Sequence, residues 1–199
     1  MNNTYATSHD NTVRRLAVLS GLILWTALAC NPTPGEGIFE AESFTYGQCD
    51  DIQLPWEPGF FTLEKFENTA YVRMQDTGRP TDGLVDGIFI RLDRDYVKEN
   101  VNQDILLGLP DASGTVRARA LMGFYKTCPQ SEVTPEMIGT IRFTRYGEEP
   151  NDQVSGTVDA PTVIDARTGD ILGLNMTGEF DFVIQFGRPY TNFTGPGNQ

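Results

Sequence analysis

Alternation of apolar and polar residues with a period of two dominates the chain from Ile38 onward. This period is typical of β-strands, whose successive side chains point to opposite faces of a sheet. The clearest strand is residues 179–186, in which large apolar residues alternate with polar ones. Its expected buried side chains are Phe180, Phe182, Ile184 and Phe186, and its expected solvent-facing ones are Glu179, Asp181 and Gln185.

The same alternation, interrupted by turns rich in Gly, Pro and Asp, predicts about eight or nine short strands. The other expected strands are residues 39–46, 60–66, 70–75, 88–92, 116–124, 141–144, 154–158 with 162–165, and 171–176. Strands do not alternate with long helices, so the sequence predicts an all-β domain. Because the strands and loops are uneven in length, we expect an antiparallel β-sandwich rather than a closed barrel.

Only two stretches carry helical signals. Asp93–Gln103 has Tyr96, Val97 and Val101 at helical spacing, and Thr134-Pro135-Glu136 is typical of a capped first turn with proline at its first position. Both are short. The sequence therefore predicts one or two short helices that cannot cover a sheet.

A targeting segment precedes the predicted domain. Residues 1–15 are polar and end in Arg14-Arg15, and residues 16–29 carry no charge. This layout is that of a signal peptide, and its apolar run is shorter than the roughly 20 residues of a membrane-spanning helix. We expect a signal peptide at 1–29, a flexible tether at 30–37 and a single β-sandwich domain at 38–199.

The end of the apolar run, Thr26-Ala27-Leu28-Ala29-Cys30, resembles the lipobox of bacterial lipoproteins. The resemblance implies that the Cys30 thiol receives a diacylglyceryl group and that the chain is cut before Cys30 and acylated there. It implies an envelope protein held by acyl chains such as palmitate, and Asn31 points to the outer membrane of a Gram-negative bacterium. The alternative is an ordinary cleavage site at 27–29, which would release a soluble protein.

The cysteine count bears on this choice. Cys30, Cys49 and Cys128 are the three cysteines, and an odd number in an exported chain leaves one thiol unpaired. Lipidation of Cys30 removes the oddity and leaves Cys49 and Cys128 to pair in an oxidising compartment. Neither belongs to a Cys-x-x-Cys motif, so a structural disulfide is expected rather than a redox or zinc site.

Charge and composition exclude several classes of function. The 199 residues include 27 Asp and Glu against 15 Lys and Arg, a net charge of −12, so nucleic acid is not an expected partner. The single histidine, His9, lies in the signal segment. The mature chain therefore has no Ser-His-Asp triad and no histidine-ligated metal. A pair of carboxylates is the remaining catalytic possibility, and acidic residues are plentiful, including Glu57, Glu64, Glu67, Asp76, Asp82, Asp86 and Glu179.

Two segments carry candidate binding residues. Asp76, Asp82 and Asp86 could place three carboxylates in one loop, which makes the loop a weak calcium candidate; no other metal and no cofactor is expected. Trp56, Phe60 and Phe61 lie close together in the sequence and could form an exposed aromatic platform for a sugar or a protein. Alternatively, Trp56 and Phe61 fill one end of the core beside the disulfide.

These features predict a lipid-anchored cell-envelope protein that acts as a non-catalytic binding or structural module. Its expected partners are the membrane, through the anchor, and an unidentified protein or polysaccharide ligand. Two alternatives stay open. One is a carbohydrate-binding module that uses Trp56, Phe60 and Phe61, and the other is a carboxylate-based glycoside hydrolase, which needs two acidic side chains converging in a cleft. No catalytic residue is assigned.

Overall fold

The computed structural model describes residues 35–49, 52–76 and 85–184, which form ten strands and one short helix. The strands are β1 (Glu36–Glu40), β2 (Ser43–Phe44), β3 (Phe60–Phe66), β4 (Thr69–Gln75), β5 (Asp86–Asp93), β6 (Asp104–Leu107), β7 (Ala118–Phe124), β8 (Pro135–Tyr146), β9 (Gln153–Asp165) and β10 (Ile171–Val183); the helix is α2 (Arg94–Glu99). The predicted all-β class is confirmed.

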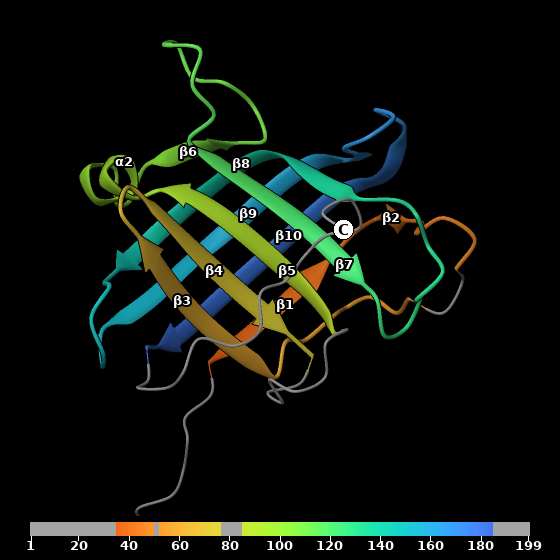
Figure 1. Cartoon of the computed structure of the whole chain (residues 1–199), viewed down its shortest axis with the longest axis horizontal. Coiled ribbons are helices and arrows are strands. Elements are labelled where there is room, and N and C mark those ends of the chain that lie inside the picture. Colours follow the sequence, from red (N-terminus) through yellow and green to blue (C-terminus); the bar gives the residue numbers. More distant parts are fainter. Residues whose placement is uncertain (1–34, 50–51, 77–84, 185–199) are drawn as a thin grey trace, which may run out of the picture. The chain divides into compact units, whose positions relative to one another are not determined.

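All ten strands belong to one hydrogen-bonded sheet. Its order is β1-β10-β9-β8-β6-β7-β5-β4-β3, with β2 paired to β10 and β7 also paired to β8. All neighbouring pairs are antiparallel except β6–β7, which is parallel, and half of the pairs are antiparallel strands that follow one another in the chain. The sheet curls, so that β3, β4 and β5 cross in front of β9, β10 and β1 (Figure 1). Its two halves thus face each other in a sandwich-like arrangement.

The curl brings the two ends of the strand order together at a junction that we call the seam. Phe39 of β1 and Trp56, which precedes β3, exchange two backbone hydrogen bonds of 2.9 and 2.8 Å. Phe61 of β3 stacks on Phe182 of β10, with ring centroids 5.5 Å apart. The Phe39 ring lies over Gly178, where a Cβ atom would come within 2.3 Å of it. Glycine at 178 is therefore what lets Phe39 fill the seam.

The core lies between the facing halves of the sheet and follows the predicted alternation. Phe180, Phe182 and Ile184 are buried, Glu179 is exposed and Asp181 is half-buried, as expected for β10. Gln185 and Phe186 lie outside the described residues. The facing half contributes inward side chains from β4, β5 and β7, namely Ala70, Val72, Met74, Ile88, Ile90, Leu92, Ala118, Ala120 and Met122.

A bulge lets β8 and β9 run longer than the pattern predicts. The segments 154–158 and 162–165 join into the single strand β9, and the register against β8 shifts between Ile138 and Thr140. Pro161 lies at this irregularity, where no ladder N–H is required of it. A Cβ on Gly139 would lie 2.1 Å from the Asp159 carbonyl oxygen, so glycine is needed there. Such bulges bend strands, which suits a curled sheet.

The helical predictions are half right. α2 begins after Asp93, whose carboxylate accepts a 3.2 Å hydrogen bond from the Tyr96 N–H, and ends at Glu99, four residues earlier than expected. The turn predicted at 134–136 is wrong, because Pro135 begins β8 instead. Proline is acceptable at the first residue of a strand, and Glu136 is held there by Arg119 of the neighbouring strand.

The outer face of β3 and β4 is less exposed to solvent than the alternation predicts. Glu64 and Arg73 point away from the core, yet they are only 8% and 4% exposed. Their side chains pair at 3.3 Å, and the Arg73 guanidinium lies 5.4 Å from the centre of the Phe89 ring. Burial disfavours both charges: it raises the pKa of Glu64 and lowers that of Arg73, although each partner opposes the shift of the other.

The alternation along β10 predicts that substitutions differ sharply between its two faces. Phe182→Ala should lower the free energy of unfolding by about 3–5 kcal/mol, because it leaves a cavity in the core. Asp181→Ala should cost less than about 1 kcal/mol, since it removes only the contacts of 2.6 and 2.8 Å from the Gln153 amide. Urea denaturation of both variants measures the difference. Equal losses would contradict the assignment of faces.

Candidate functional site

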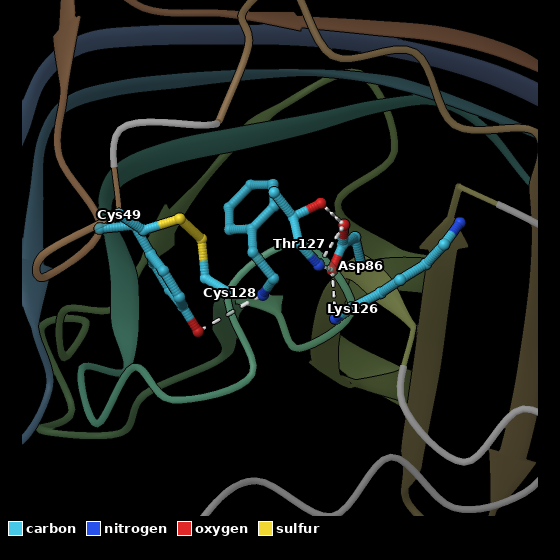
Figure 2. The surroundings of a disulfide bond; sticks show 7 residues. Cys49, Asp86, Lys126, Thr127 and Cys128 are labelled. Carbon is cyan, nitrogen blue, oxygen red and sulfur yellow. Dashed lines mark hydrogen bonds between the residues drawn. A yellow bond between two sulfur atoms is a disulfide. The ribbon is translucent and has the colours of Figure 1, made fainter.

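The predicted disulfide between Cys49 and Cys128 is confirmed. Their Cα atoms lie 6.1 Å apart, and the bridge joins the segment after β2 to the turn after β7 (Figure 2). The Cys49 N–H also donates to the Tyr46 carbonyl, and the Cys128 N–H to the Phe124 carbonyl. Both half-cystines are therefore held in turns of the backbone as well as by the bond itself.

The described carboxylates of the calcium candidate loop bind protein donors. Asp86 is buried and accepts from the Lys126 N–H at 2.8 Å and from the Thr127 N–H and hydroxyl (Figure 2). Asp76 accepts from the Lys126 ammonium at 2.8 Å. Asp82 lies outside the described residues. In the part of the chain that the structure describes, no three Asp, Glu, Cys or His side chains are grouped to hold a metal.

The aromatic segment does not present its three rings on one face. Phe60 and Phe61 are consecutive in β3, so their side chains point to opposite faces of the sheet. Trp56 is half-buried and packs at the seam, with its ring 5.9 Å from Phe39 and 6.4 Å from Phe124. Phe61 is also half-buried, against Phe182. These contacts are those of core side chains at the end of the domain that carries the disulfide.

The predicted lipidation residue, Cys30, lies outside the described residues. Within residues 35–49, 52–76 and 85–184, no helix has the length and apolar content needed to cross a membrane.

A cleft on the outer face of β1, β8, β9 and β10 gathers acidic side chains. It measures about 690 Å³ and includes Glu36, Glu57, Glu179 and Asp181 in its wall. Glu36 lies directly opposite Asp181 across the β1–β10 ladder. The structure thus brings the sequence candidates Glu57 and Glu179 into one cleft, although nothing in their surroundings distinguishes an acid from a nucleophile.

A second cleft, on the outer face of β5 and β7 beside α2, contains three arginines, and we call it the arginine cleft. It measures about 530 Å³. The lining residues are Asn68, Thr69, Arg91, Leu92, Asp93, Asp95, Tyr96, Glu99, Thr115, Val116, Arg117 and Arg119. In a chain with a net charge of −12, three arginines in one cleft form an unusual concentration of hydrogen-bond donors.

Two of these arginines are fixed by carboxylates. Arg117 donates to Asp111 at 2.7 Å and to Asp93 at 2.6 Å, and its guanidinium lies 4.6 Å from the centre of the Tyr96 ring. Arg119 donates to both oxygens of Glu136 at 2.7 Å. These hydrogen bonds raise the pKa of both arginines, and the pKa of Asp111 is lowered by its contacts with Ser113 and Arg117.

Arg91 differs from both. It lies directly opposite Arg119 in the β5–β7 ladder and is exposed. Among the described residues, it has no hydrogen-bond or ion-pair partner. Like charges directly opposite each other in a sheet are unfavourable, so the pair carries a cost that the protein's own acceptors do not relieve at Arg91.

We compared the chain with protein-family models, curated proteins and solved structures. No match was found. The sequence did not reveal this cleft, because the pattern along single strands does not show that the register brings Arg91 and Arg119 together.

Glu148 fixes the α2 side of the arginine cleft. Its carboxylate accepts from Arg94 at 2.8 Å, from Lys98 at 2.7 Å and from the Tyr146 hydroxyl at 3.1 Å. Burial acts to raise the pKa of Glu148, but the hydrogen bonds from Lys98, Arg94 and Tyr146 outweigh it and leave the pKa below its usual value. The buried carboxylate thus ties the helix to the loop between β8 and β9.

Glu148→Gln should lower the free energy of unfolding at pH 7 by about 1–3 kcal/mol, because it removes charge-assisted hydrogen bonds. Since the folded pKa is depressed, this stabilisation is complete above the unfolded pKa near 4.5 and is lost as the pH falls through the folded value. Urea denaturation at pH 7 and pH 3 should show the gap between wild type and variant narrowing. Glu149→Gln, at an exposed neighbouring carboxylate, is the control. A gap that is unchanged at pH 3 would contradict the depressed pKa.

Removing the disulfide should be costly, because it closes a loop with a sequence separation of 79 residues. The double variant Cys49→Ser/Cys128→Ser should lose about 4–5 kcal/mol of stability in the chain-entropy model. Urea denaturation measures the loss, and mass spectrometry of unreduced peptides checks the bridge. Free thiols at both positions in the exported wild-type protein would refute the pairing.

Proposed function

We propose that the protein is exported, anchored to the cell envelope through a lipid on Cys30, and acts as a non-catalytic binding module. The observation that carries this proposal is the disulfide between Cys49 and Cys128. Disulfides form and persist in oxidising compartments, so the bridge supports export. It also uses two of the three cysteines, which leaves Cys30 as the single thiol that needs another role.

The position of Cys30 supports lipidation as that role. It follows directly on the uncharged run 16–29, and Thr26-Ala27-Leu28-Ala29-Cys30 resembles a lipobox. The described domain begins a few residues later, with β1 at Glu36. Cys30 therefore lies close to the domain in sequence, as an anchored residue joined by a short tether would. Asn31 favours the outer membrane.

Binding without catalysis is the role that the clefts support best. Both lie on outer faces of a sheet whose inner faces form the core. The mature chain has no histidine, and two arginines of the arginine cleft are held rigidly by carboxylates. Fixed polar groups on a rigid sheet suit recognition of a polar ligand.

Cys30→Ala tests the anchor. The variant should incorporate no palmitate analogue and should accumulate as uncleaved precursor, because both steps need the thiol. Metabolic labelling and immunoblotting of membrane fractions measure these outcomes. The Cys49→Ser/Cys128→Ser variant is the matched control, since it loses two thiols but keeps Cys30 and should still be labelled. Normal cleavage and anchoring of Cys30→Ala would overturn the proposal.

A further inference from the structure

We infer that the arginine cleft binds an acidic saccharide, with the oxyanion of the ligand on Arg91 and Arg119 and its hydroxyl groups toward α2. The inference deepens the proposed binding function by naming a class of ligand. It moves sugar recognition away from Trp56, Phe60 and Phe61, whose rings do not share a face, to a cleft of polar groups.

Two arginines of the cleft face each other on neighbouring strands. Arg91 and Arg119 occupy directly opposite positions on β5 and β7, and both are exposed. The backbone ladder holds the two side chains at adjacent positions on the outer face, so their like charges repel each other. An anion between the two guanidinium groups removes this cost. The register of β5 against β7 therefore creates a site that favours a negative charge.

Both arginines have N–H groups that are available to a ligand. Arg119 donates to Glu136 through Nε and Nη2, which leaves Nη1 without an acceptor among the described residues. Arg91 uses none of its five N–H groups within the same part of the chain. Guanidinium groups bind carboxylates, sulfates and phosphates through paired N–H donors. One fixed and one available guanidinium thus line the same cleft.

Carboxylates line the arginine cleft on the side of α2. Asp93 accepts hydrogen bonds from Arg117 and from the Tyr96 N–H, whereas Asp95 and Glu99 of α2 are exposed in the cleft. Carboxylates repel a simple anion but accept hydrogen bonds from hydroxyl groups. A ligand that carries one oxyanion and several hydroxyls fits both walls. The same carboxylates disfavour polyanions such as nucleic acids.

The size of the cleft agrees with this class of ligand. Its volume of about 530 Å³ lies within the usual range of small-molecule sites, about 300–1,000 Å³. The wall on the α2 side is held by Glu148 through Arg94 and Lys98, so the two walls keep their separation. A uronic acid unit combines the required oxyanion and hydroxyl groups.

Isothermal titration calorimetry of the full-length exported protein in a non-ionic detergent tests the inference, with sodium glucuronate as the probe. Glucose and inorganic sulfate, at matched ionic strength, are the comparison ligands. We expect glucuronate to bind more tightly than either one. Arg91→Gln should weaken glucuronate binding about tenfold or more, as expected for loss of a charge-assisted contact.

Arg145→Gln is the matched control, because it removes the same charge from the outer face that carries the acidic cleft. It should leave glucuronate binding unchanged. Arg91 has no described partner to lose, and its substitution removes the repulsion from Arg119, so the thermal midpoint of unfolding should stay the same or rise. Absence of glucuronate binding, equal binding of sulfate, or equal affinity of wild type and Arg91→Gln would overturn the inference. Cys30 labelling is a separate readout, so this failure is distinguishable from failure of the anchor.

Discussion

Closure of the curled sheet at the seam is the constraint on which the rest of the molecule depends. The sheet has two faces, and because the described chain has only one six-residue helix to cover it, one face becomes an interior by closure of the sheet. The backbone pairing of Phe39 with Trp56 and the stacking of Phe61 on Phe182 bring β1 and β3 together. The apolar side chains of β4, β5 and β7 then meet those of β9 and β10. The outer faces are left to carry charged groups, and both charged clefts lie there.

Properties that depend on near neighbours in the chain could be predicted from the sequence. Alternation identified most of the strands, though not β6, and the buried face of β10, because the period of a strand is a local property. The boundaries were harder. Pro161 divided β9 in the pattern, yet the strand continues through a bulge that Gly139 of the partner strand makes possible. Thr134-Pro135-Glu136 carried a helical signal, but pairing of Glu136 with Arg119 keeps this segment in the sheet. Long-range contacts decided both cases.

The same distinction between local patterns and long-range contacts applies to the candidate sites. Cys49 and Cys128 could be paired from the sequence because counting was sufficient. The arginine cleft could not be found, because Arg91 and Arg119 meet only through the register of β5 against β7. The burial of Glu64 and Arg73 was equally hidden. Period two shows which way a side chain points, but it does not show how much solvent reaches that face. The chemistry of the outer faces of a sheet can therefore be interpreted only when the fold is known.

The disulfide also divides the chain mechanically. It closes a covalent ring from Cys49 to Cys128 that contains β3, β4, β5, α2, β6 and β7, while β1, β2, β8, β9 and β10 lie outside it. If tension is applied between the two ends of the chain, the sulfur bridge carries the force past the backbone of the ring, whose strands receive it only through non-covalent contacts such as the pairing of β6 and β7 with β8. The three arginines of the arginine cleft all belong to the ring. The acidic cleft is built mostly from strands outside the ring, which receive the force directly, so pulling would deform it first.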